Sequence, residues 1–89
     1  MNTSVDLPVP GHARISVFPN PANDKVMVYS ERAMREVQLL DINSRIVNKI
    51  MPSGQKAQLD LTGLAEGIYF LKVYTTAGKI TVKKIIVQD

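Results

Sequence analysis

The sequence of 89 residues contains no cysteine and no tryptophan, and its single histidine is His12. Without cysteine the chain forms no disulfides and offers no thiolate to a metal, which excludes the disulfide-rich class of small secreted domains. The sequence does not indicate a catalytic nucleophile paired with histidine, because it has no cysteine and no serine in a GxSxG motif. We therefore predict no catalytic residue and no enzyme activity.

Charge clusters and long apolar runs are also missing. The 11 basic and 8 acidic residues give a formal charge of +3, and Lys83 and Lys84 are the only adjacent basic pair. Scattered basic residues do not make a nucleic-acid surface, so we predict no nucleic-acid partner. No apolar run is long enough for a membrane-spanning helix. With 45% hydrophobic residues, the chain is nevertheless apolar enough to fold.

Metal and phosphate sites have weak signals. Asn20, Asn23 and Asp24 carry oxygen atoms of the kind that Ca²⁺ prefers, but the same residues are typical of turns. No EF-hand pattern surrounds them, and Gly63 and Gly67 do not belong to a P-loop. We therefore predict no metal and no cofactor.

The first 13 residues contain proline, glycine and small residues without periodicity. They are typical of a linker, either from an upstream passenger protein or as an artificial extension, and the polar residues after Met1 do not form a signal peptide. Residues 14–89 are then expected to form one small domain.

Short alternating segments follow at the spacing of an all-β sandwich or barrel. We predict an immunoglobulin-like β-sandwich of about seven antiparallel strands. These strands are ISVF, KVMVYS, EVQLLDI, RIVNKI, QLDL, GIYFLKVYT and KITVKKIIV. ERAMREV has a weak helical pattern but is short, and we expect it to be a charged loop.

The segment PNPAND, at residues 19–24, predicts a rigid turn. Pro19 and Pro21 fix φ and lack an N–H, which excludes a central strand. Asn20, Asn23 and Asp24 favour side-chain bonds to nearby backbone. We expect the turn to reverse the chain between the first two strands and to lower the entropy lost on folding.

The strand that begins at Gly67 has two distinct faces. Tyr69 near its start is typical of the tyrosine corner of immunoglobulin-like sandwiches. The side chains expected to face inward are Tyr69, Leu71 and Val73. The opposite face, formed by Ile68, Phe70, Lys72 and Tyr74, is too apolar for an ordinary exposed surface. It is either covered by loops or a contact surface.

The last residues, KKIIVQD, are apolar on both faces of a strand, with Ile85 and Val87 on one and Ile86 on the other. Chain ends usually fray, so such a strand is either covered on both sides or bound by a partner. Lys83 and Lys84 would discourage unwanted pairing along a free edge.

Four segments, in this order, resemble one family: ISVFPNPANDKVMV, EVQLLDINSRIV, LDLTGLAEGIYFLKV and GKITVKKIIVQ. They are similar to the type A C-terminal sorting domain of the type IX (Por) secretion system, over roughly Ala13 to Asp89. The positions that match the family's structural motifs are Pro19, Asn20, Pro21, Asp24, Gly67 and Tyr69. Two positions depart from the pattern: Ser44, where glycine is frequent, and Asp89, where lysine or glutamine is frequent.

The resemblance implies a sorting function in Bacteroidetes. The precursor would cross the inner membrane by the Sec route into the periplasm. The domain would then direct a folded passenger through the outer-membrane translocon and its shuttle barrel to the cell surface or the medium. A sortase-like signal peptidase would cut in the linker before Ile15 and join the passenger to anionic lipopolysaccharide.

Two roles for the terminal strand stay open at this stage. Translocon recognition is expected at Lys83, Lys84, Ile85, Ile86 and Val87, through strand addition with unpaired backbone groups. Alternatively, Ile85 and Val87 simply close the sandwich, and both roles are compatible. An apolar terminal strand could also exchange between chains and give a homodimer.

Two other functions compete with sorting. A generic immunoglobulin-like or fibronectin-like adhesion module needs no particular C-terminus. A carbohydrate-binding module needs an aromatic platform, for which Tyr29, Phe70 and Tyr74 would have to lie together on one surface.

Overall fold

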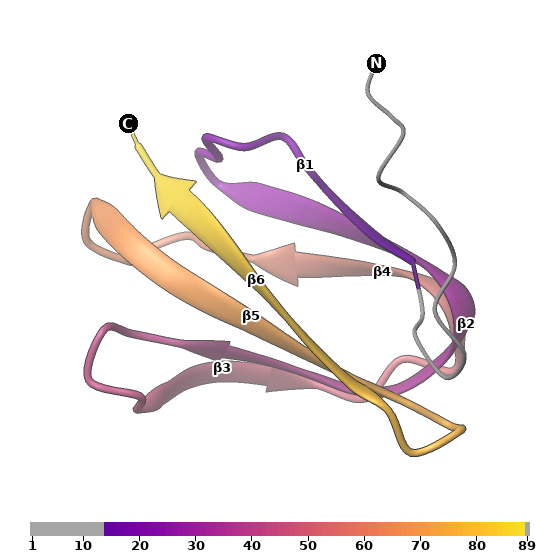
Figure 1. The fold of residues 1–89 in the computed structure, drawn as a ribbon. Coiled ribbons are helices and arrows are strands. Elements are labelled where there is room, and N and C mark those ends of the chain that lie inside the picture. The colour runs from indigo at the N-terminus through magenta and orange to yellow at the C-terminus, as the bar shows by residue number, and fades with distance from the viewer. Residues whose placement is uncertain (1–13, 89) are drawn as a thin grey trace, which may run out of the picture.

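Six strands and no helix make up residues 14–88, which the computed structural model describes. The strands are β1 (Ile15–Phe18), β2 (Lys25–Leu40), β3 (Ile46–Ile50), β4 (Gly54–Asp60), β5 (Gly67–Thr75) and β6 (Ile80–Val87) (Figure 1). No segment of this described range is therefore a helix that could cross a membrane. The linker expected at residues 1–13 lies outside the described residues.

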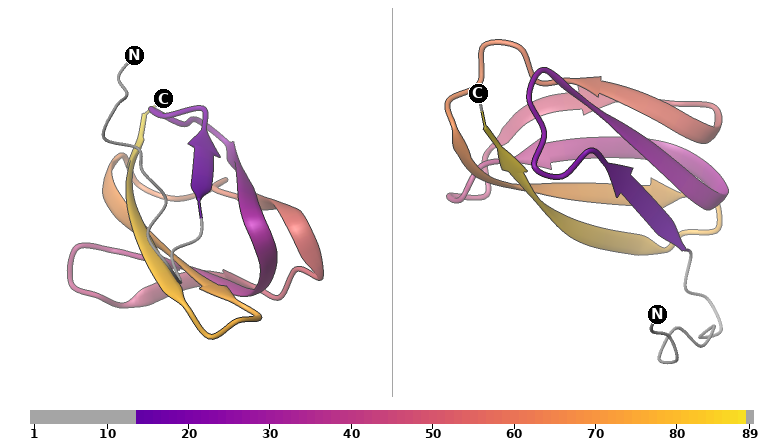
Figure 2. Two further views of the ribbon diagram at one scale, coloured as in Figure 1. Left: turned by 45° about the vertical axis from the view of Figure 1, so that its right-hand side comes forward. Right: turned by 90° about the horizontal axis from the view of Figure 1, so that it is seen from above.

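The long strand β2 belongs to both layers of the fold. Its first half pairs with β1 and β4, and its second half pairs with β3 and β5, all antiparallel. β6 then pairs with the free side of β5. Because β2 bends strongly along its length, the single sheet folds over into two facing layers (Figures 1 and 2). The first layer contains β1, β4 and the first half of β2, and the second layer contains β3, β5, β6 and the second half of β2. The prediction of an antiparallel β-sandwich is confirmed.

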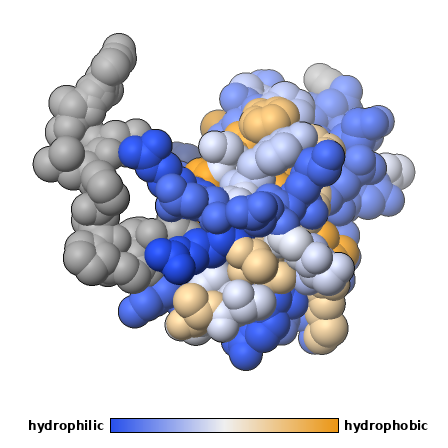
Figure 3. Space-filling model, turned by 90° about the vertical axis from the view of Figure 1, so that its right-hand side faces the viewer, coloured by the Kyte–Doolittle hydropathy of each residue, from blue (hydrophilic) through white to orange (hydrophobic). Residues whose placement is uncertain are grey.

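The bend in β2 corrects the expected strand count. ERAMREV was expected to be a loop between two strands, but it lies inside β2 and joins them, which gives six strands. Register shifts flank Met34, whose side chain is 1% exposed on the inside of the bend. Three of the four charged residues of this segment, Glu31, Arg32 and Arg35, are exposed, and Glu36 is half-buried. The end of the molecule at which β2 bends is correspondingly mostly hydrophilic (Figure 3).

The change of burial phase along β2 shows why the bend is needed. Val26 and Val28 are buried before it, at even positions, whereas Val37 and Leu39 are buried after it, at odd positions. A strand that moves from one layer to the other turns its inward face over, and an irregularity in the ladder allows this. The core therefore receives side chains from both halves of one strand.

The core lies between the two layers and is apolar. Among its fully buried side chains are Leu39, Leu59, Leu61, Leu71, Val73 and Ile85. Burying a side chain of this size stabilises a fold by about 1.5–3 kcal/mol. The inward positions predicted on β5, namely Tyr69, Leu71 and Val73, are all buried.

Candidate recognition site

The terminal strand β6 has one buried and one exposed face. Ile85 and Val87 are 0% and 2% exposed and pair in register with Tyr69 and Gly67 of β5. Lys84 and Ile86 lie on the other face and are exposed, and Lys83 is exposed although it shares the face of Ile85. Ile85 and Val87 thus complete the core, as the second of the two open interpretations expected.

The outer edge of β6 is occupied by the proline-rich turn between β1 and β2. Asn20 Nδ2 donates to the carbonyl of Lys84 at 3.2 Å, and the N–H of Ile86 donates to Asn20 Oδ1 at 3.0 Å. The primary amide of Asn20 therefore bonds to β6 much as a neighbouring strand would, with one donor and one acceptor.

Ala22 continues this contact with its backbone. Its N–H donates to the carbonyl of Ile86 at 2.7 Å, and its carbonyl accepts from the N–H of Gln88 at 2.8 Å. The two bonds form an isolated parallel bridge opposite Val87. Figures 1 and 2 show the end of β6 beside this turn. PNPAND thus reverses the chain and also closes the open side of the sandwich.

This contact occupies most of the edge of β6 that the expected strand addition would use. Strand addition at residues 83–87 needs unpaired backbone groups on the outer edge, and in β6 these groups occur at alternate residues. The carbonyl of Lys84, the N–H and carbonyl of Ile86, and the N–H of Gln88 already have partners in the turn. Within the described part of the chain, the outward backbone groups that have no such partner include those of Val82 and the N–H of Lys84.

The C-terminal end of PNPAND is held by a backbone hydrogen bond of Asp24. The peptide bonds Phe18–Pro19 and Asn20–Pro21 are both cis. The carbonyl of Asp24 accepts from the N–H of Leu61 at 2.8 Å, just after β4. The motif therefore contacts the second layer through Asn20 and the first layer through Asp24.

Tyr69 forms a corner contact at the start of β5. Its side chain is 7% exposed, and its hydroxyl donates to the carbonyl of Ala65 at 2.7 Å. A tyrosine bonded to backbone a few residues upstream is the arrangement expected of a tyrosine corner. Gly67 between them has φ +149°, a conformation that residues with a Cβ rarely adopt.

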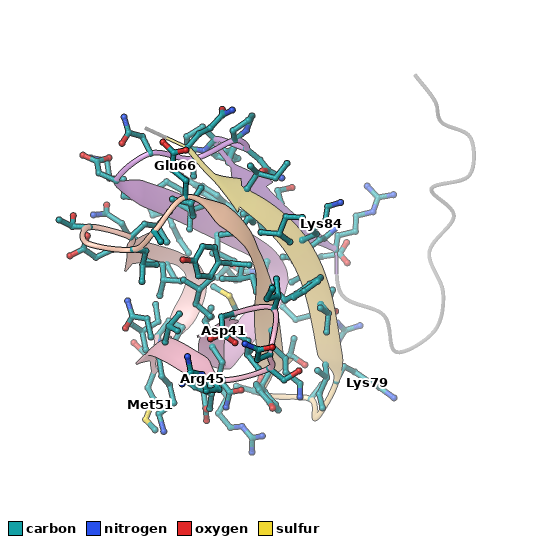
Figure 4. All side chains as sticks on the ribbon, turned by 90° about the vertical axis from the view of Figure 1, so that its left-hand side faces the viewer. Asp41, Arg45, Met51, Glu66, Lys79 and Lys84 are labelled. Carbon is teal, nitrogen blue, oxygen red and sulfur yellow. The ribbon has the colours of Figure 1, made fainter. Side chains whose placement is uncertain are left out.

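Two aspartates in exposed turns, Asp41 and Asp60, have a lowered pKa because their carboxylates accept hydrogen bonds. The backbone N–H of Arg45 is the main cause for Asp41, whose pKa is below its ordinary value of 3.8, and the Arg45 side chain adds an ion pair at 3.2 Å. Figure 4 shows this pair after β2. Hydrogen bonds from Thr62 lower the pKa of Asp60 in the same direction. Both carboxylates stabilise turns.

Ser44, one departure from the family pattern, lies in the turn of Asp41 and has φ +65°. This left-handed conformation favours glycine, which explains why glycine suits the position. The serine is accommodated in a turn in which Asp41 accepts three backbone N–H groups, two at Oδ1 and one at its carbonyl.

The structure does not form the aromatic platform that a carbohydrate-binding module requires. Tyr29 stacks on Phe18 on the outside of the first layer, with ring centroids 5.3 Å apart. Phe70 and Tyr74 lie on the outside of the second layer, since their neighbours in β5 fill the core. The three aromatics considered for sugar binding are thus divided between opposite faces.

Residues 14–88 contain no group of three or more His, Cys, Asp or Glu side chains that could hold a metal ion. The oxygen of Asn20, which the sequence offered as a calcium ligand, accepts the N–H of Ile86.

Comparisons with known proteins agree with this architecture. The family model described as "Secretion system C-terminal sorting domain" matches residues 16–88. The crystal structure of CopC from Methylosinus trichosporium OB3b is similar with a TM-score of 0.53, over 84% of this chain and 94% of that one. At 17% identity, that likeness shows the fold alone. No curated protein matches the chain.

Proposed function

Because the chain belongs to the family of secretion system C-terminal sorting domains, we propose that it directs an attached passenger through the outer-membrane translocon of the type IX system. The observation that carries the proposal is the family match over residues 16–88. The family is one of sorting signals for secretion, so the passenger is destined for the outer membrane, the cell surface or the medium.

The finer steps of the proposal follow the family's route. The precursor enters the periplasm by Sec, and the translocon with its shuttle barrel accepts the folded domain. A sortase-like signal peptidase then cuts before Ile15 and attaches the passenger to anionic lipopolysaccharide. The start of β1 at Ile15 supports this position, because a cut there leaves every strand of the sandwich intact.

Within the terminal strand the five candidate residues take different roles in this proposal. Lys83, Lys84 and Ile86 are exposed and are available to the translocon through their side chains. Ile85 and Val87 contribute to recognition indirectly, because they hold β6 in the core.

An export assay tests the proposed function. The whole chain is fused behind a Sec signal and a fluorescent reporter, in a host with the type IX system and in a matched strain without the translocon. We expect reporter at the surface only in the first strain. Retention in the periplasm of both strains, with a folded domain, would favour the adhesion-module alternative instead.

A variant of the tail completes the assay. Deleting Ile85 to Asp89 would remove core side chains and unfold the domain, which would confound the result. Lys83→Ala with Lys84→Ala changes only exposed side chains, and we expect it to lower export without unfolding. Mass spectrometry of the released reporter then tests the cut before Ile15, and size-exclusion chromatography tests the strand-exchanged dimer.

A further inference from the structure

The outer face of β5 and β6 carries an ordered set of apolar and cationic side chains. Successive residues of a strand point to opposite faces, so the neighbours of the buried Tyr69, Leu71 and Val73 point outward. The strand register places them in rows: Ile68 beside Ile86, Phe70 beside Lys84, and Lys72 beside Val82. We refer to this surface as the β5–β6 outer face.

The aliphatic members of this face on β5 and β6 are exposed. Val82 is 55% exposed, and Ile80, in the next row beside Tyr74, is 53% exposed. The apolar surface continues through the half-buried Leu40 of β2 to the exposed Ile46 of β3. Contiguous apolar surface of this kind on a small domain marks an interaction site. Of the two interpretations that the sequence left open, a contact surface is the one that fits.

The charged members that β5 and β6 contribute to the face are cationic, whereas on the neighbouring β2 the Glu36 carboxylate lies in register with Tyr74 and accepts a hydrogen bond from Gln38. Lys72 Nζ and the Arg35 guanidinium lie 5.7 and 5.9 Å from the centre of the Tyr74 ring. Lys84 projects from β6 (Figure 4). No carboxylate within residues 14–88 forms an ion pair with Lys72 or Lys84. The charge complement of this face is therefore an acidic partner.

The geometry points to face-on docking. A partner that added a strand to β6 would meet the turn from Lys84 to Gln88, where Asn20 and Ala22 already hold the backbone groups. We propose that a protein surface with apolar side chains bordered by carboxylates docks on the β5–β6 outer face. This inference rests on the proposed function, within which the partner is a component of the outer-membrane translocon.

A protein fits this face better than a lipid surface does. An element that lies in a bilayer surface buries its apolar face about 5–10 Å into the boundary between headgroups and acyl chains. The apolar groups here are short side chains on a sheet, and Phe70 and Tyr74 are half-buried among their neighbours. Aromatic residues and arginine beside each other are instead typical of protein interfaces.

The test reverses charge on two faces of the same domain. Lys72→Glu with Lys84→Glu changes the β5–β6 outer face. The matched control is Lys56→Glu on the first layer, where Lys56 Nζ lies 6.0 Å from the centre of the Tyr29 ring. Val82→Ser removes exposed apolar surface from the face, and Ile42→Ser does so in a turn. Thermal melting of each purified variant identifies any that is unfolded.

Two readouts are compared for each fusion: surface delivery of the reporter, and affinity for the type IX translocon complex purified in detergent. We expect the double variant to lose at least about tenfold in affinity and in surface delivery, because like charges would then face each other. Val82→Ser should weaken both in the same direction. The control variants should stay within about twofold of wild type.

The outcomes separate this inference from the proposed function. If the wild-type fusion is exported and the correctly folded variants of the β5–β6 outer face are exported equally well, face-on docking is overturned and the sorting function still stands. Absence of wild-type export would overturn the sorting function. A further experiment measures binding of the domain to vesicles of phosphatidylglycerol and phosphatidylcholine. If the domain binds these vesicles through Lys72 and Lys84 but does not bind the translocon complex, the inference is overturned in favour of a membrane partner.

Discussion

Asn20 is expected to hold the terminal strand in place, and Asn20→Ala tests this. The substitution removes one hydrogen bond to the carbonyl of Lys84 and one from the N–H of Ile86. A typical intramolecular hydrogen bond contributes about 0.5–1.5 kcal/mol to stability. Since both partners are exposed and can bond to water, we expect a total loss of about 1–2 kcal/mol.

The assay combines unfolding with amide hydrogen exchange. In a domain of this size, a loss of 1 kcal/mol lowers the melting temperature by about 4–8 °C. Exchange should accelerate by about tenfold at the N–H of Ile86, whose acceptor is the Asn20 side chain. The amide of Ile85 belongs to a residue paired with β5 and should change much less.

A matched control lies in the same turn. Asn23→Ala replaces an exposed amide side chain that makes no hydrogen bond within residues 14–88. It should leave exchange at Ile86 unchanged. Equal exchange of Ile86 in wild type and Asn20→Ala would refute the idea that the turn holds β6, and the core contacts of Ile85 would then suffice.

Two further predictions concern single side chains. Tyr69→Phe removes the bond to the Ala65 carbonyl and should cost about 1–2 kcal/mol in urea unfolding; an unchanged midpoint would show that the corner contact contributes nothing. Asp41→Asn should destabilise the domain at neutral pH. Because the folded pKa of Asp41 is lowered, its contribution to the free energy of unfolding is fully present above the ordinary value of 3.8. That contribution is lost as pH falls through the folded pKa, so the melting curves of variant and wild type should converge in acid. A difference that stays constant with pH would contradict this cause.

Local patterns were sufficient to predict most strands and the inward side chains of β5. Alternation placed Tyr69, Leu71 and Val73 on the buried face because the period of a strand is fixed by its backbone. ERAMREV could not be placed in the same way. Most of its charged residues are exposed on the outside of a bend, and Met34, buried on the inside, continues β2 through it.

The contact between the proline turn and β6 could not be predicted from local patterns either. Asn20 and Ile86 are separated by 66 positions, and a turn-forming asparagine gives no sign of a distant partner. Ala22 and Gln88 were missed for the same reason, because their contribution is made by backbone groups that every residue carries.

Photo-crosslinking in exporting cells tests most directly whether the secretion machinery contacts the β5–β6 outer face. A photoreactive amino acid is placed at Val82 on that face or at Phe18 on the opposite layer, both exposed. We expect crosslinks to an outer-membrane translocon component from Val82 and none from Phe18. Crosslinks to that component from Phe18 alone, in cells that export both variants, would contradict face-on recognition at β5 and β6.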